Sequence, residues 1–317
     1  MMTNYGNFDV GIPLFIAKLF LDTLFTSSRQ VTFCYYSTLP ACNLFDDVVK
    51  YCPLVGFQTV TGSDLGNLGL ILLCFFAIVL SILFIIFAQR RSGAVGRREM
   101  QILFFSYIIV SISAIFASGG FINNRRVLIW FSAVEIGSTA STAWLLFVNA
   151  VVAYQLLPDG GFLSVTLTFL SGLAVFIGTS YIALDSGFSW TGELTSNASN
   201  PGLLRNYAVY TIYLLFPIVA IVAYFLLEVY LVARVLRERK PLFLLITAFL
   251  LFVIGQIFEF VVSRYICSHT NGKIDGSLFA CLFTLLSFGA LWAFWESITE
   301  DEWAGQAPGW EAEMREI

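Results

Sequence analysis

Long, uninterrupted apolar stretches dominate the sequence from residue 65 onward. The clearest runs from Leu65 to Ala88 without a single charged residue. A membrane-spanning helix needs about 20 consecutive apolar residues. Seven stretches have about that length: 65–88, 101–120, 127–153, 162–184, 207–232, 242–264 and 276–296. Because they are hydrophobic on all sides, they predict helices in lipid rather than the short alternating strands of a membrane barrel.

The composition of the whole chain agrees with a membrane protein. It is 58% hydrophobic and only 12% charged, which is more apolar surface than one soluble core can bury. We therefore expect an all-α polytopic membrane protein built as a seven-transmembrane-helix bundle. No block of Lys and Arg suggests a nucleic-acid partner, so the bilayer is the expected surrounding.

The chain before the first long stretch differs from a cleaved signal peptide. Its first dozen residues lack basic residues, and the apolar run 11–25 contains Lys18 and Asp22 one turn apart. We interpret this run as an amphipathic helix lying in the membrane interface. The alternative is an additional span, for which the run is short.

The distribution of basic residues predicts the orientation in the membrane, since Lys and Arg favour cytoplasmic loops. The two groups of basic residues both fall on one side of a seven-span bundle: Arg90, Arg91, Arg97 and Arg98, then Arg234, Arg237, Arg239 and Lys240. Arg125 and Arg126 run mildly against the rule. The balance predicts a lumenal N-terminus and a cytoplasmic C-terminus.

The cysteines and one sequon fit this orientation. Cys34, Cys42, Cys52 and Cys267 fall on the lumenal side, where two disulfides are expected, with three pairings open. Four free thiols are the alternative. Asn197 in Asn-Ala-Ser is a glycosylation candidate on the same side. Cys74 and Cys281 lie within spans, where we expect them to be small packing residues.

Three regions follow from this organisation. Residues 1–64 form a small lumenal region stapled by cysteines, residues 65–296 form the bundle, and residues 297–317 form a cytoplasmic tail. The tail is acidic and contains Trp303 and Trp310. It is either a solvated end with an aromatic anchor or a short motif for a cytosolic partner such as a vesicle coat.

Several kinds of chemistry lack the residues that they need. The last span contains no lysine for a retinal Schiff base, and His269 is the only histidine, so a multi-histidine metal site is excluded. No P-loop, G-x-S-x-G or G-x-G-x-x-G motif occurs, nor do the triplets typical of G-protein-coupled receptors. We expect no cofactor, no metal and no catalytic residues.

Ionisable groups inside spans are costly and point to function. Glu135, Glu228 and Glu259 are such groups, and we expect Glu228 to snorkel to the nearby interface. Glu135 precedes the small-residue run 137–143, which either packs within the bundle or offers a surface to another protein's helix.

Motifs spread along the chain resemble the fungal chitin synthase export chaperone family of the endoplasmic reticulum. The resemblance is collinear from about residue 31 to residue 303. The matching positions are Cys34, Pro40 and Cys42; Ala94 to Glu99 with Phe104 and Phe105; Glu135, Ile136, Gly137 and Trp144; Gln155, Leu156, Asp159 and Gly160; Gly255 and Gln256; Cys267, Asp275 and Gly276; and Trp295, Glu296 and Thr299 to Asp301. The sequence departs from the family pattern in three places. The segment 1–30 is longer than the family pattern has it. Residue 159 follows a proline rather than an acid, and residue 135 is Glu where the family pattern has an amide.

The resemblance implies a membrane chaperone without enzymatic activity. It would bind a polytopic chitin synthase in the endoplasmic reticulum, prevent its aggregation and enable its exit, supporting cell-wall chitin synthesis. The client-contact candidates are Gly96, Arg97, Glu99, Glu135, Trp144 and Gln256. The competing hypotheses are a small-solute transporter or receptor that uses Glu135 and Glu259, and a membrane lipid enzyme without histidine chemistry.

Overall fold

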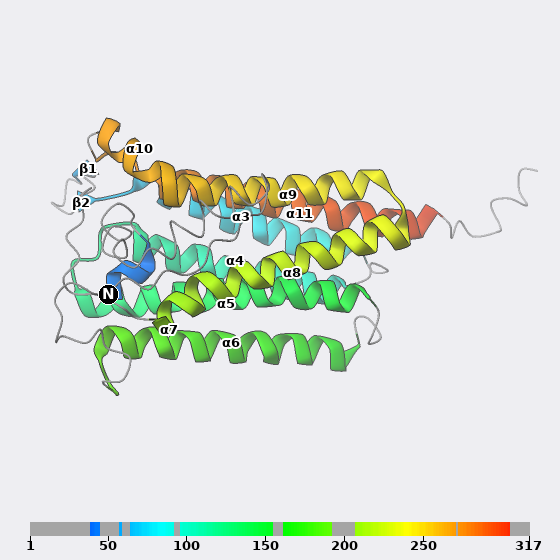
Figure 1. The fold of residues 1–317 in the computed structure, drawn as a ribbon, viewed down its shortest axis with the longest axis horizontal. Helices are drawn as coiled ribbons and strands as arrows, with labels where there is room; N and C mark the ends of the chain where they lie inside the picture. The colour runs from blue at the N-terminus through cyan, green and yellow to red at the C-terminus, as the bar shows by residue number, and fades with distance from the viewer. Residues whose placement is uncertain are drawn as a thin grey trace, which may run out of the picture.

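The computed structural model describes residues 39–44, 57–58, 64–91, 96–154, 161–191, 207–270 and 272–304. Within them, long helices run side by side along the longest axis of the molecule (Figure 1). Their bounds are α3 Leu68–Arg90, α4 Arg97–Ser118, α5 Arg125–Ala153, α6 Phe162–Phe188, α7 Tyr207–Tyr210, α8 Phe216–Tyr230, α9 Arg239–Ile257, α10 Ser263–Thr270 and α11 Gly276–Ala304. Three π-helical turns continue them: η2 Thr211–Leu215, η3 Leu231–Leu236 and η4 Phe258–Val262.

All seven predicted spans are confirmed as helices long and apolar enough to cross a membrane. The fifth span combines α7, η2, α8 and η3, and the sixth combines α9 and η4. The last helix continues beyond residue 296, where we expected the tail to begin, and ends at Ala304. Its buried Ser297 and Thr299 donate to the carbonyls of Phe294 and Trp295, so this extra length is packed helix.

The two ends of the bundle differ in their contents. One end, which we call the η1 end, carries the short 3-10 helix η1 (Pro40–Leu44), the paired strands β1 (Phe57–Gln58) and β2 (Asp64–Leu65), and α10 (Figure 1). The opposite end, the Arg91 end, carries the connection from α3 to α4 and the turn from α8 to α9. There Arg91 forms an ion pair with Glu296 and ties α3 to α11.

Polar side chains fix the helix starts at the η1 end. The Asn67 side chain accepts a hydrogen bond from the Leu70 amide and so caps α3, while its Nδ2 donates to Asp275 at 2.9 Å. Asn43 of η1 donates to the Ala117 carbonyl and to Ser132, both at 3.0 Å. These bonds join η1 to α4 and α5, and the start of α3 to the start of α11.

Six of the helices form a ring, and α6 lies outside it. The order around the ring is α3, α4, α5, α8, α9 and α11, which returns to α3. Helix α6 packs mainly on α5 and is drawn at the edge of the molecule (Figure 1). Helix α8 packs mainly on α5, and α9 packs mainly on α11. The contact between α8 and α9 is therefore the slightest in the ring.

The small-residue run on α5 packs within the bundle. Ser141 donates to the Gly172 carbonyl of α6 at 2.8 Å, and the Thr142 hydroxyl lies 2.7 Å from the Ser106 hydroxyl of α4. Gly137 meets Ser180 of α6 so closely that a Cβ there would overlap its hydroxyl. Of the two readings that the sequence left open, the internal interface is the observed one.

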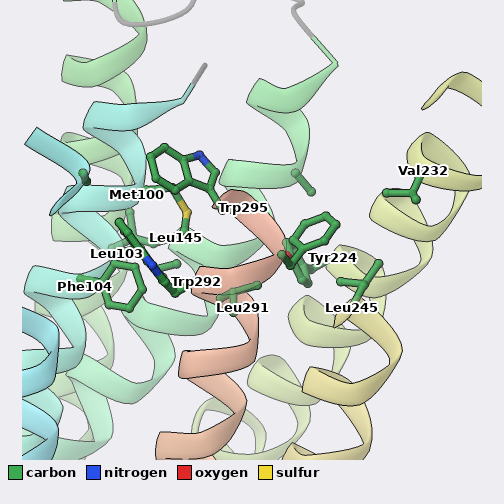
Figure 2. Close-up of a cluster of buried hydrophobic side chains, with 13 residues drawn as sticks. Met100, Leu103, Phe104, Leu145, Tyr224, Val232, Leu245, Leu291, Trp292 and Trp295 are labelled. Atoms are coloured by element: carbon green, nitrogen blue, oxygen red, sulfur yellow. The ribbon is translucent and has the colours of Figure 1, made fainter. Parts of the chain in front are cut away.

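Aromatic side chains form the core near the Arg91 end (Figure 2). Trp292 of α11 stacks on Phe84 of α3, with ring centroids 4.9 Å apart, and meets Phe104 of α4 edge-on. Figure 2 shows Phe104 and Trp292 with Met100 of α4, Leu145 of α5 and Tyr224 of α8 in the same cluster. Large rings with specific packing geometry hold the helices together where lipid removes the usual hydrophobic driving force.

Several predicted features fall outside the described residues: the segment 11–25, Cys34, Cys52, Asn197 and the tail beyond residue 304. Cys42 of η1 and Cys267 of α10 are both disulfide-bonded. Cys74 and Cys281 are free thiols.

The close contact between α5 and α6 predicts that a larger side chain at position 137 destabilises the protein. Gly137→Leu should lower the free energy of unfolding by about 1–3 kcal/mol or more, because the side chain overlaps Ser180. The matched control is Gly178→Leu on α6, where an added Cβ meets open space. Thermal unfolding in mild detergent measures both, and equal midpoints for the two variants would contradict this packing.

Candidate functional site: a polar cavity inside the ring

A cavity of about 300 Å³ lies inside the ring of six helices. Pro40 of η1 and Leu39 just before it line one end of the cavity. At the other end it reaches the aromatic core, where Tyr224, Leu245 and Leu291 come from three different helices (Figure 2). Its lining is mostly apolar, and the strongest polar groups in it are Glu135, Glu259, Gln256, Tyr107, Tyr213, Cys74 and Cys281.

Two acidic side chains face this cavity from different helices. Glu135 of α5 is 9% exposed, and Glu259 of η4 is 7% exposed. No described residue gives a hydrogen bond to Oε2 of either carboxyl group. Buried polar groups are normally paired, so these two oxygens mark a place where the bundle leaves hydrogen-bonding capacity unused.

Two π-helical turns shape the same half of the cavity. Turn η2 contributes Tyr213 and Leu214 to the lining, and turn η4 contributes Glu259 and Phe260. A π-helical turn inserts an extra residue and thereby rotates the following side chains, and such turns are frequent at functional sites. The sequence carries no simple signal for these turns, so the orientation of Glu259 could not be predicted.

The two thiols within the spans meet across the cavity wall. Sγ of Cys74 on α3 lies 3.7 Å from Sγ of Cys281 on α11. Both side chains line the cavity. We expected each to be a packing residue by itself, because nothing in the sequence pairs positions that lie so far apart along the chain.

The wall between α8 and α9 is the weakest part of the ring. Phe225 of α8 stacks on Phe249 of α9 with ring centroids 4.2 Å apart, and both rings line the cavity. From their shared turn at the Arg91 end, the two helices diverge toward the η1 end (Figure 1). We call this line between α8 and α9 the seam. Along the seam, side chains close the cavity toward the membrane, because the two helices themselves make little contact.

Two further acids are buried away from the cavity. Glu228 is 4% exposed, so the expectation that it snorkels to the interface is wrong: packing within the bundle covers its carboxyl group. Glu99, in the first turn of α4, is fully buried and accepts a hydrogen bond from Ser164 of α6 at 2.8 Å. This bond ties the peripheral helix α6 to the ring.

The client-contact candidates do not form one surface. Glu135 and Gln256 line the cavity, whereas Gly96 and Arg97 lie partly exposed at the Arg91 end. Glu99 is inaccessible from outside. Trp144 of α5 stacks on Phe216 of α8 with ring centroids 6.2 Å apart, and its Nε1 has no hydrogen-bond partner among the described residues.

The arrangement around the cavity is suited to binding. Carboxyl, amide and phenol groups offer hydrogen bonds and charge within an apolar wall. Among the described residues, no three His, Cys, Asp or Glu side chains converge as metal ligands would.

Seven membrane-length helices, six of them around a partly polar interior, define a polytopic helical membrane protein. The family model described as chitin synthase export chaperone matches residues 27–307. The chain therefore belongs to the chitin synthase export chaperone family.

Curated relatives of this name are similar to the chain along most of its length. It is 29% identical over 227 residues to a chitin synthase export chaperone of Coccidioides immitis, covering 71% of this chain and 66% of that relative, just under two thirds. It is 29% identical over 273 residues to one of Phaeosphaeria nodorum, covering 80% of each chain. A relative from Cryptococcus neoformans is 27% identical over 272 residues, covering 85% of this chain and 73% of the relative. No solved structure matches the chain significantly.

The hydrogen bond between Ser164 and Glu99 predicts that removing the Ser164 hydroxyl destabilises the protein. Ser164→Ala should lower the free energy of unfolding by about 1–3 kcal/mol, because it leaves the buried Glu99 carboxyl without a donor. Ser171→Ala is the control, since that hydroxyl donates only to the Thr168 carbonyl of its own helix. Chemical unfolding in detergent compares the two. An equal cost for both substitutions would contradict a structural role for Glu99.

Proposed function

We propose that this protein binds a polytopic chitin synthase in the endoplasmic reticulum membrane, prevents its aggregation and enables its exit. The match to the family model over residues 27–307 carries this proposal, together with the similarity to chitin synthase export chaperones of fungi. The role supports cell-wall chitin synthesis and requires no turnover chemistry, so we propose that the protein is not an enzyme. The acidic tail is the part of the chain suited to a vesicle coat protein.

The outer face of α5 between its neighbours is the best supported contact surface for a client helix. The small-residue run of α5 is occupied by α4 and α6, which leaves the face near Trp144. Trp144 is half-buried, its indole Nε1 is itself covered, and no described residue accepts a hydrogen bond from it. In lipid an interhelical hydrogen bond contributes about 0.6–2 kcal/mol, so a client helix that turned this indole outward would gain by offering it an acceptor.

The distribution of charge supports the orientation that the sequence predicted. Arg90, Arg91, Arg97 and Arg98 gather at the Arg91 end, beside the exposed Arg237, Arg239 and Lys240 of the turn between α8 and α9. We propose that this end is cytoplasmic and that the N-terminal region, stapled by disulfides of Cys34, Cys42, Cys52 and Cys267, is lumenal. At the η1 end, Trp130, Phe188 and Trp190 cluster as interfacial aromatics do.

Purification of the tagged protein in mild detergent tests the client directly. A chitin synthase should be recovered in stoichiometric amount, and deletion of the protein should trap that synthase in the endoplasmic reticulum and lower wall chitin. Trp144→Phe keeps the ring but removes the N–H, and should lower client recovery about three- to tenfold. Trp130→Phe, an exposed tryptophan of the same helix, is the control. Normal synthase delivery in the deletion strain rules the proposal out.

The orientation has its own test at Asn197. The protein should shift on gels after endoglycosidase treatment, and Asn197→Gln should abolish that shift, because only a lumenal sequon receives a glycan. Non-reducing peptide mapping of the same preparation should find Cys34 and Cys52 in disulfides. Four free thiols at Cys34, Cys42, Cys52 and Cys267 would contradict the proposed disulfides. A sequon without a glycan, in a loop that a reagent labels from the cytosol, would contradict the proposed orientation.

A further inference from the structure

The interior of the ring holds unused acidic groups and a lining without positive charge. Glu135 and Glu259 are both more than nine-tenths buried, both line the cavity, and Oε2 of each lacks a donor among the described residues. None of the described side chains that line the cavity is basic. A ligand that pairs with these two carboxyl groups must supply hydrogen-bond donors or positive charge.

An amine satisfies both requirements at once. A buried carboxylate is costly unless a cation or strong donors accompany it, and intramembrane acids are normally paired. A primary ammonium group carries three donors and one positive charge. Two of those donors would meet the carboxyl groups of Glu135 and Glu259, and Gln256 and Tyr213, which line the same cavity, offer acceptors for the third.

The size and walls of the cavity define the rest of the ligand. A volume of about 300 Å³ corresponds to about ten groups the size of a water molecule, each taking ~30 Å³. That is enough for a head group and the first part of an alkyl chain. The walls along the seam are apolar, with Ile221 and Phe225 on α8 and Phe249 and Phe252 on α9. The remainder of such a chain would pass between α8 and α9 into the lipid.

We propose that this cavity binds a single-chain amphiphile with a primary amine head group, taken from the bilayer through the seam between α8 and α9. The head group lies between Glu135 and Glu259, and the chain lies along the phenylalanine rings of the seam. The site is separate from the proposed client contact, because Trp144 does not line the cavity.

The structure favours a lipid over a helix of a client protein. Residues of six helices line the cavity, and Leu39 and Pro40 line it at the η1 end. A helix with its side chains is about 10–12 Å wide, which is too wide to enter where Phe225 and Phe249 stack. An extended alkyl chain needs only the displacement of these two rings.

Binding of radiolabelled hexadecylamine to the full-length protein in phosphatidylcholine nanodiscs tests the proposal, with empty nanodiscs as background. The wild type should bind one molecule saturably, and Glu135→Gln and Glu259→Gln should each weaken binding about tenfold or more. Glu228→Gln is the matched control, since Glu228 is an equally buried acid that does not line the cavity. It should bind as the wild type does.

Competition with other molecules identifies the recognised chemistry. Unlabelled hexadecylamine should displace the labelled hexadecylamine. Hexadecanol, palmitate and butylamine should each need a concentration at least about tenfold higher for the same displacement. Equal displacement by hexadecanol or palmitate would overturn amine recognition, and equal displacement by butylamine would indicate a water-soluble solute. Absence of saturable binding, or unchanged binding in both cavity variants, would also overturn the proposal.

A photoreactive residue at position 252 distinguishes the two kinds of occupant. Phe252 lines the cavity on α9, so irradiation of the protein purified from its own membrane should give an adduct with the mass of a lipid amine. An adduct with a client polypeptide would show instead that a protein segment occupies the cavity.

Discussion

The bilayer interior offers no water, so every polar group that enters it must find a partner within the protein. The bundle meets this constraint mainly by local bonds. Hydroxyls on the spans donate to carbonyls one turn earlier, as Ser81 does to Ala77, Ser111 to Tyr107 and Thr179 to Val175. Other hydroxyls bridge helices, and these bridges are what bind α4, α5 and α6 into one unit. The same constraint makes the remaining unpaired groups informative.

Among the described residues, those unpaired groups lie either at the cavity or between packed helices. Glu135 and Glu259 face the cavity, and Trp144 lies between α5 and α8. Glu99, Ser180 and Glu228 are covered within the bundle away from the cavity. Each leaves a hydrogen-bonding atom unused at a cost that a globular core rarely tolerates. The cavity pair faces the interior of the ring, whereas the tryptophan lies in the contact between α5 and α8. The proposed ligand site and the proposed client contact therefore use different faces of α5.

The ring is not packed equally firmly all the way round. The ring keeps a rigid aromatic core at the Arg91 end and a weaker seam between α8 and α9. A ligand at the seam would change the spacing of α8, the helix on which Trp144 rests. The cavity and the proposed client contact thus share helix α8.

The sequence by itself determined the number of spans and the family, because hydrophobic length and motif order are properties of contiguous residues. It did not show that Cys74 meets Cys281, that Glu135 and Glu259 share a cavity, or that Glu228 is buried instead of snorkelling. The helices are hydrophobic nearly all round, so their periodicity does not tell which face points inward. The π-helical turns further rotate Tyr213 and Glu259. Only packing between distant helices fixes these rotations, and the tertiary structure therefore decided where the polar groups converge.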